Sequence, residues 1–164
     1  MMPEILDAAR RMRRHRSAYT PGRVLELGAY NVNGTIRDVF QHDATEYVGV
    51  DGCPGPCVDE VVDGESLIAR FGLGSFDTVL CFETLEHVVF PWLVVEQLKG
   101  VLRPGGMLWV STPTFEFPLH RYPLDCYRFG TDAYERWLFK DFVAADVLLI
   151  PNVPVIIGAG SKPA

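Results

Sequence analysis

Hydrophobic residues recur along this chain with two spacings, one typical of helices and one typical of buried strands. Residues 3–16 carry apolar side chains at helical spacing, namely Ile5, Leu6, Ala9 and Met12, which predicts an amphipathic helix. A turn at Thr20-Pro21-Gly22 ends it. Nearly continuous apolar runs follow, as expected of strands buried on both faces. These predicted strands cover residues 23–28, 46–51, 58–62, 76–82 and 107–111.

Helical patterns separate the predicted strands. Asn33-Gly34-Thr35 is typical of a helix start and precedes residues 36–41, and residues 65–71 form a second short helix. Residues 90–102 form a third helix, whose expected inward-facing residues are Leu93, Val94, Leu98 and Leu102. This alternation of strands and helices predicts an α/β fold with a parallel sheet covered by helices.

The last third of the chain breaks the alternation. Residues 131–141 are predicted to form a helix with Thr131 as its N-cap, followed by strands at 142–150 and 155–158. Only four residues join these two strands, whereas a parallel crossover needs a dozen or more. The mostly parallel sheet should therefore end in an antiparallel C-terminal hairpin.

Length and composition favour one domain over residues 1–164, with residues 1–20 as an N-terminal helical segment. No apolar run reaches the roughly 18 residues that span a bilayer, so no membrane partner is expected. The first residues lack the apolar region of a signal peptide. Four cysteines in such a chain indicate free thiols and a cytoplasmic location. Cys53 and Cys57 lack further ligands in the sequence to complete a zinc set, so no metal site is expected.

Charge is distributed unevenly. The formal net charge is −6, yet the six arginines within residues 1–23 make that segment positive. The acidic remainder argues against a nucleic-acid partner, because binding phosphates requires clustered Lys and Arg. The basic segment is interpreted as a solvated helix face.

The end of the first predicted strand carries a glycine turn with an acidic neighbour. Gly28 permits a tight turn and close approach of a ligand to the backbone. A dinucleotide site would need glycine where Tyr30 stands, and Glu26 would lie near the phosphates. The charge of Glu26 suits a cationic ligand such as S-adenosylmethionine, which has a sulfonium and an ammonium but no phosphate. The alternative is that Gly28 is only a turn and Glu26 only a loop partner.

Acidic residues also follow the second and third predicted strands. Asp51 lies about twenty residues beyond the glycine turn, where a carboxylate can accept hydrogen bonds from ribose hydroxyls. The alternative is a solvated turn before Gly52. Asp63, followed by Gly64, could accept the adenine amino hydrogens or cap the helix that starts at Glu65.

The fourth predicted strand runs into Cys81-Phe82-Glu83-Thr84-Leu85-Glu86-His87. Phe82 could lie beside the ligand. Glu86 and His87 are polar residues at the junction with the next helix. A single histidine in this position is more typical of a structural hydrogen bond than of a general base.

Four segments in this order resemble the class I S-adenosylmethionine-dependent methyltransferases. They are VLELGAYNVNG, YVGVD, FDTVLCFETLEHV and LRPGGMLWVSTP. The chain is most similar to the small single-domain members of the methyltransferase type 11-like group, whose fourth strand ends in E-x-L-E-H. The resemblance implies a Rossmann-like, doubly wound sheet of seven strands with an antiparallel last strand. Tyr30 departs from the family pattern, which often has glycine there.

The resemblance also implies roles for the strand-end residues. Glu26 and Gly28 would flank the methionine part of the cofactor, Asp51 would hold the ribose, and Cys81 and Phe82 would line the pocket floor. The full set of expected cofactor-binding residues is Glu26, Gly28, Tyr30, Asp51, Gly52, Asp63, Gly64, Cys81 and Phe82.

Residues 113–130 form a long, aromatic-rich loop that we expect to face the substrate. His120 and Asp125 are the candidate catalytic residues, since histidine titrates in the range a general base needs. Tyr127 and Arg128 are the candidate substrate-binding residues. The alternative is that His120 and Asp125 only hold the loop in place, with Arg128 paired to Asp125.

These features favour methyl transfer from S-adenosylmethionine to an oxygen or nitrogen of a small-molecule or glycan acceptor. The acceptor site would be formed by the 113–130 loop and the N-terminal helix, or by a partner. One alternative is a non-catalytic S-adenosylmethionine-binding partner subunit. A nicotinamide-dependent oxidoreductase is disfavoured by Glu26, Tyr30 and the terminal hairpin. A monomer or homodimer is expected.

Overall fold

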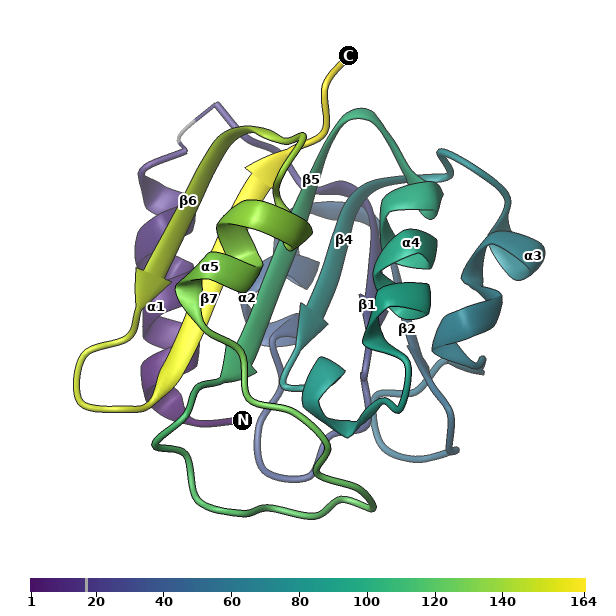
Figure 1. Ribbon diagram of the computed structural model, residues 1–164. Coiled ribbons are helices and arrows are strands. Elements are labelled where there is room, and N and C mark those ends of the chain that lie inside the picture. Colours follow the sequence, from purple (N-terminus) through teal and green to yellow (C-terminus); the bar gives the residue numbers. More distant parts are fainter. Residues whose placement is uncertain (17) are drawn as a thin grey trace.

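The computed structural model describes residues 1–16 and 18–164, and it is built around one seven-stranded sheet with helices on both faces (Figure 1). The strand order is β3-β2-β1-β4-β5-β7-β6. The strands are β1 (Gly22–Leu27), β2 (Ala44–Asp51), β3 (Glu60–Val61), β4 (Phe76–Phe82), β5 (Leu102–Pro113), β6 (Val143–Leu149) and β7 (Val155–Ser161).

The first five strands pair in parallel, whereas β7 is antiparallel to both β5 and β6. The predicted Rossmann-like sheet with an antiparallel C-terminal hairpin is therefore confirmed. The hairpin follows from the short connection between β6 and β7, which cannot form a parallel crossover.

Helices cover the sheet in two layers. On one face lie α1 (Pro3–Arg14), α2 (Arg37–Phe40) and the short 3-10 helix η1 (Gln41–Asp43). On the other lie η2 (Gly64–Ser66), α3 (Leu67–Phe71), η3 (Leu85–His87), α4 (Pro91–Val101), α5 (Thr131–Ala133) and the π-helical turn η4 (Tyr134–Leu138). Trp109 is buried among the first layer and Leu108 among the second, as alternation along β5 requires. No helix within the described ranges is long and apolar enough to cross a bilayer.

Two predicted helices differ in detail from the structure. In α4, Leu93 is 38% exposed and Val95 is buried in its place, because Val95 shares a helix face with Val94 and Leu98. The predicted helix over residues 131–141 is a short α5 continued by a π turn, and Thr131 makes no side-chain cap. Tyr134 is fully buried there, and its hydroxyl accepts from or donates to Thr112 Oγ1 at 2.8 Å and donates to the Ile156 carbonyl at 3.1 Å.

Chain order across the sheet reverses at β1. The chain proceeds from β1 to β2 and β3 on one side, and then crosses to β4 and β5 on the other. In open α/β sheets such a reversal leaves a crevice at the carboxyl ends of the two central strands. The ends of β1 and β4 are therefore where this fold places a ligand.

Candidate functional site

Gly28 begins the turn that follows β1 and lies at this crevice. Its φ is +84°, a conformation that side chains rarely adopt, and a Cβ here would be 1.9 Å from Thr84 Oγ1. The amides of Gly28 and Ala29 both donate to the Val50 carbonyl, at 2.9 and 3.1 Å. Glycine at position 28 therefore allows three strand ends to converge on one point.

Asp51 ends β2 beside this turn. Its two carboxylate oxygens accept backbone hydrogens from Tyr30 at 3.3 Å and from Cys53 at 3.1 Å. Each oxygen keeps a further lone pair. The space around the position of a Gly52 Cβ is open to at least 4 Å. Asp51 is thus fixed by the backbone next to an open position at Gly52, and its contact with a ribose stays a prediction.

Glu26 lies beneath the turn and is only 3% exposed. Tyr47 donates its hydroxyl to Glu26 Oε2 at 2.7 Å. Burial raises the pKa of Glu26 to about 7, against the opposing effects of this hydrogen bond and of Arg37. The guanidinium of Arg37 stacks on the Tyr47 ring, 4.6 Å from its centre, and pairs with Asp59. The observed contacts of Glu26 are with other side chains of the protein, as the structural alternative expected. Contact of Glu26 with the cofactor stays a prediction.

Tyr30 occupies the position where the family pattern often has glycine. Its ring packs directly on Gly55, where a Cβ would lie 2.1 Å from the ring, and its centre is 6.4 Å from that of Tyr122. The side chain therefore links the loop after β2 to the 113–130 loop. Gly55 makes the room that the missing glycine at position 30 would otherwise supply.

Two further predicted cofactor residues lie at the start of η2. Asp63 accepts the Glu65 amide hydrogen at 2.8 Å and is the N-cap of η2. A Cβ on Gly64 would approach Leu27 and Val94 to 3.2 and 3.3 Å, so this glycine allows η2 to lie close against the sheet. The capping role of Asp63 is seen directly, and its contact with adenine stays a prediction.

Cys81 and Phe82, predicted to line the pocket floor, belong to the core. Cys81 is packed on the α4 side of the sheet and Phe82 on the α1 side. Burial raises the pKa of the Cys81 thiol, so it is kept protonated. Any contact of these two buried side chains with a ligand would therefore be through the floor of the pocket.

Glu83 and Glu86 bring two carboxyl groups to the end of β4. Glu83 has a φ of +50° and accepts the Ser111 hydroxyl at 2.9 Å, while its amide donates to the Ser111 carbonyl at 3.0 Å. Burial raises the pKa of Glu83 to about 7. The pKa of Glu86 is raised further, first by burial and then by the charge of Glu83.

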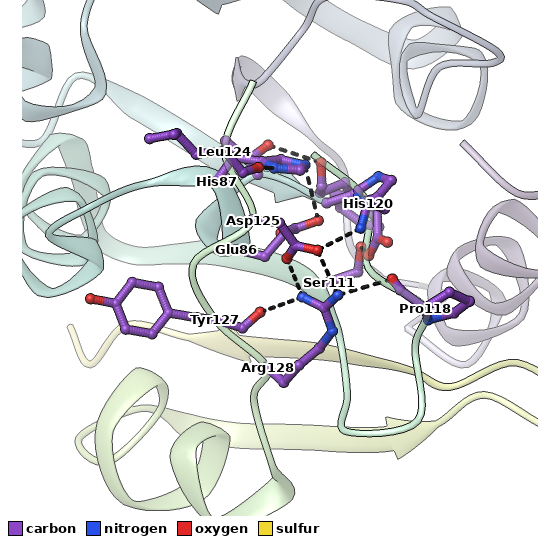
Figure 2. A network of polar contacts seen from close by, with 12 residues as sticks. Glu86, His87, Ser111, Pro118, His120, Leu124, Asp125, Tyr127 and Arg128 are labelled. Atoms are coloured by element: carbon purple, nitrogen blue, oxygen red, sulfur yellow. Dashed lines mark hydrogen bonds and ion pairs between the residues drawn. The ribbon is translucent and has the colours of Figure 1, made fainter. Parts of the chain in front are cut away.

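The 113–130 loop crosses the end of β4 and is tied to η3 (Figure 2). The Glu86 carbonyl accepts hydrogens from the amides of Cys126 at 2.7 Å and Tyr127 at 3.3 Å. The Tyr127 hydroxyl donates to the Val89 carbonyl at 2.8 Å. These bonds bring the predicted substrate-side loop to the crevice.

Asp125 and Arg128 hold the loop in shape. The Arg128 guanidinium pairs with both oxygens of Asp125, through Nη1 and, at 2.7 Å, through Nη2. It also donates to three loop carbonyls, those of Phe117, Pro118 and Tyr127. Arg128 holds the pKa of Asp125 well below its usual range, and the Asp125 side chain is 1% exposed. These contacts agree with the alternative in which Asp125 and Arg128 only hold the loop in place. The catalytic role of Asp125 and the substrate-binding roles of Tyr127 and Arg128 stay predictions.

His120 is exposed at the tip of this loop. Its amide donates to Asp125 Oδ2 at 2.6 Å, and its ring centre lies 4.8 Å from that of His87. Partial burial, followed by the neighbouring His87, lowers the pKa of His120. A lowered pKa keeps the imidazole neutral and able to accept a proton at neutral pH.

Sequence reasoning missed how Glu83, Glu86 and His87 combine with His120. The available signal was the spacing E-x-x-E-H, which places these residues on the single turn after β4. The contribution of His120 could not be predicted, because it depends on how the long loop folds back.

A groove of about 1030 Å³ lies between the 113–130 loop and the β6–β7 hairpin. Arg128, Phe129 and Ile156 are among the residues that line it. Glu26, Gly28 and Asp51 do not line it, so it is separate from the crevice between β1 and β4.

A family model described as a methyltransferase domain matches residues 4–141. Among curated proteins, the ubiquinone biosynthesis O-methyltransferase of Xanthomonas euvesicatoria is 43% identical over 58 residues, which are 35% of this chain and 24% of that protein. The match thus spans about a quarter of that relative's length.

Two solved structures illustrate the likeness in fold. The 1,6-didemethyltoxoflavin-N1-methyltransferase of Burkholderia thailandensis, solved with S-adenosylhomocysteine, has a TM-score of 0.66 at 16% identity, covering 97% of this chain and 78% of that one. A SAM-dependent methyltransferase from Archaeoglobus fulgidus has a TM-score of 0.69 at 12% identity, covering 94% and 93%. The chain is therefore similar to these proteins in overall fold.

Proposed function

The chain belongs to the class I S-adenosylmethionine-dependent methyltransferase domain family, and we propose that it transfers a methyl group to an oxygen or nitrogen atom of a small-molecule or sugar acceptor. The observation that carries the proposal is the convergence of Gly28 and Asp51 at the β1–β4 crevice.

The residues present fit this cofactor. The tight turn at Gly28 lets a ligand approach the backbone, and Asp51 has free lone pairs beside open space. The acidic residue Asp51 suits a cationic ligand better than the phosphates of a dinucleotide. Bound S-adenosylmethionine supplies an electrophilic methyl group.

The remaining chemistry belongs to the chain. In this proposal Asp51 accepts the ribose hydroxyls, Gly28 and Tyr30 border the methionine part, and Asp63 lies beside the adenine. Because the methyl group is already activated, the main contribution of the protein is to align the acceptor with it.

The acceptor would be held by the 113–130 loop. His120 is exposed and has a lowered pKa, which supports a role as general base toward a hydroxyl. The matched relative is named an O-methyltransferase and the Burkholderia neighbour an N1-methyltransferase, which supports either oxygen or nitrogen as the accepting atom.

Calorimetry with S-adenosylhomocysteine and NAD in parallel tests the cofactor assignment. We expect S-adenosylhomocysteine to bind in the micromolar range and NAD to give no signal. Tight NAD binding without an S-adenosylhomocysteine signal would contradict the proposal. A screen of metabolites and sugar nucleotides for methyl transfer then identifies the acceptor, and cofactor binding without transfer to any of them would favour a non-catalytic subunit.

The proposal extends to the organisation of the protein. We infer that residues 1–164 act as one domain, as a monomer or homodimer. All four cysteines are free, Cys53 and Cys126 being exposed, which fits a reducing compartment such as the cytoplasm.

A further inference from the structure

Three potential metal ligands meet where the 113–130 loop crosses the end of β4. Glu86 and His87 lie on η3, and His120 comes from the loop (Figure 2). One ligand atom from each of the three side chains lies within 4.8 Å of the other two. The turn after β4 and the loop thus bring together a carboxylate and two imidazoles.

The carboxyl group of Glu86 has no satisfactory partner in this arrangement. The residue is 0% exposed. Neither of its oxygens has a hydrogen-bond partner among residues 1–16 and 18–164. His87 Nε2 lies 3.5 Å from Oε1, beyond the usual hydrogen-bond length. A buried polar group without a partner is costly and points to a missing ligand.

His87 presents a lone pair to this carboxyl group. Its Nδ1 contacts the backbone carbonyl of Leu124, which can only accept a hydrogen, so Nδ1 carries the proton. In the neutral imidazole, Nε2 then has a free lone pair, which lies 3.5 Å from Oε1 of the protonated, buried carboxyl group of Glu86. A backbone carbonyl that fixes the far nitrogen in this way is the usual support of a metal-binding histidine.

We propose that Glu86, His87 and His120 bind a divalent first-row transition-metal ion. A cation would displace the proton of Glu86, bind all three ligand atoms and give the buried carboxyl group the partner that it lacks. Two ligands each about 2.1 Å from an ion at a tetrahedral angle are about 3.4 Å apart, close to the observed separation of Glu86 from His87. Mixed carboxylate and imidazole ligands favour ions such as Zn²⁺, Mn²⁺ or Co²⁺ over Ca²⁺ or Mg²⁺.

The surrounding loop contacts hold the two histidines in place. Asp125 accepts the amide hydrogen of His120 at 2.6 Å and is itself paired with Arg128. The Leu124 carbonyl contacts His87 from the same loop. The ion pair of Asp125 and Arg128 thus supports the proposed metal site.

Three protein ligands leave at least one coordination position open, as in catalytic rather than structural sites. On the basis of the proposed function, this position takes an oxygen of the acceptor. With the ion bound, His120 is a ligand, and the ion replaces it as the group that activates the acceptor hydroxyl. The metal ion lowers the pKa of a bound hydroxyl, whose proton passes to solvent. The oxygen then forms the bond to the methyl carbon while the carbon–sulfur bond breaks, leaving its electron pair on sulfur. A hydroxyl-bearing acceptor is therefore the class that this site fits.

Metal titration of the full-length, EDTA-treated protein tests the site. Isothermal calorimetry with ZnCl2, MnCl2 and CoCl2 should show one binding event per chain for at least one ion. Affinity should fall at least tenfold in His87→Gln, His120→Gln and Glu86→Gln. The matched control is His42→Gln, an exposed histidine next to Asp43, which should bind as the wild type does. His120 is exposed, so its variant stays informative if Glu86→Gln fails to fold.

The outcomes separate this inference from the proposed function. Equal affinity in the wild type and His120→Gln, or no binding of any of the three ions, would overturn the metal site. S-adenosylhomocysteine calorimetry on the same EDTA-treated sample provides the second measurement. Cofactor binding without metal binding removes only the metal site, and metal binding without cofactor binding removes only the proposed function.

Discussion

Gly28 and Thr84 meet across the crevice so closely that a single added carbon would collide with the threonine hydroxyl. The position of a Gly28 Cβ is 1.9 Å from Thr84 Oγ1 and 3.0 Å from Thr84 Cβ. Thr84 in turn donates its hydroxyl to the Phe82 carbonyl at 2.9 Å. The turns after β1 and β4 are thus mutually dependent, and their spacing sets the shape of the proposed cofactor site.

Gly28→Ala should destabilise the fold by about 2–4 kcal/mol. Alanine is strained in the left-handed backbone conformation of this position, and its Cβ would also collide with Thr84. Thr84→Ala in the same chain removes the colliding hydroxyl and should recover at least about 1 kcal/mol. Urea unfolding of the two single variants and the double variant measures this coupling. Additive effects of the two substitutions would show that the turns do not constrain each other.

Asp51→Ala should reduce S-adenosylhomocysteine affinity at least 100-fold, because the ribose hydroxyls lose their acceptor. Asp51 also accepts the Tyr30 and Cys53 amides, so part of the loss could arise from a loosened loop. Asp51→Asn keeps one acceptor oxygen and hence only one of these two backbone bonds, so a smaller loss of affinity than in Asp51→Ala is expected. Asp38→Ala, at an exposed site on α2, is the matched control, and calorimetry is the measurement. Unchanged affinity in Asp51→Ala would refute the ribose assignment.

Arg128→Lys should loosen the 113–130 loop while leaving cofactor affinity within about twofold. Lysine cannot reproduce the two-point pairing with Asp125 or reach the three loop carbonyls together. The His120 amide donates its hydrogen to Asp125, so its hydrogen-exchange rate should rise at least tenfold in the variant. Arg121→Lys, on the same loop, is the control. Unchanged exchange would show that the loop is held by its other contacts.

Alternation of strand and helix patterns was sufficient to predict the sheet and its antiparallel hairpin. The hairpin followed from one number, the four residues between the last two strands. Boundaries were less accurate where tertiary contacts decide them. Tyr134, for example, is held by Thr112 and Ile156, which lie on other strands, and the local sequence carries no sign of either contact.

The candidate site was predictable where it follows the chain and not where it depends on folding back. Gly28 and Asp51 stand at strand ends, so their meeting could be expected from the order of elements. Glu26 lies beneath the turn and accepts the hydroxyl of Tyr47 from the neighbouring strand, a contact that the sequence did not predict, and its expected contact with the cofactor stays a prediction. The approach of His120 to His87 requires the path of an eighteen-residue loop, which periodicity does not encode.

His120→Ala should leave S-adenosylhomocysteine affinity unchanged and lower turnover by about 10²- to 10⁴-fold, the range expected when a proton acceptor or an ion-binding residue is lost. Because the side chain of His120 is exposed, the substitution should not impair folding, and a loss of turnover would reflect a role in the reaction. Steady-state kinetics with the identified acceptor, alongside calorimetry, supplies both readouts. Full turnover in His120→Ala would remove it from the catalytic residues.

Glu26 should make stability depend on pH in a sense opposite to that of most carboxylates. Burial raises its pKa from 4.5 to about 7 in the folded protein, so between these values the folded state holds a proton that the unfolded state has lost. The contribution of Glu26 to the free energy of unfolding is therefore fully present below about pH 4.5 and is lost as the pH rises towards 7. The total change is up to about 3 kcal/mol, at 1.36 kcal/mol for each unit.

Glu26→Gln removes this titration while keeping an oxygen that can accept the Tyr47 hydroxyl. Urea unfolding of the wild type and the variant at pH 5 and pH 8 isolates the effect, because Glu83, Glu86 and all other groups are common to both chains. The wild type should lose about 2–3 kcal/mol more than Glu26→Gln between these pH values. If both proteins lose the same amount, Glu26 is ionised in the folded state at pH 5, and the charge that the sequence suggested for a cationic ligand is present after all.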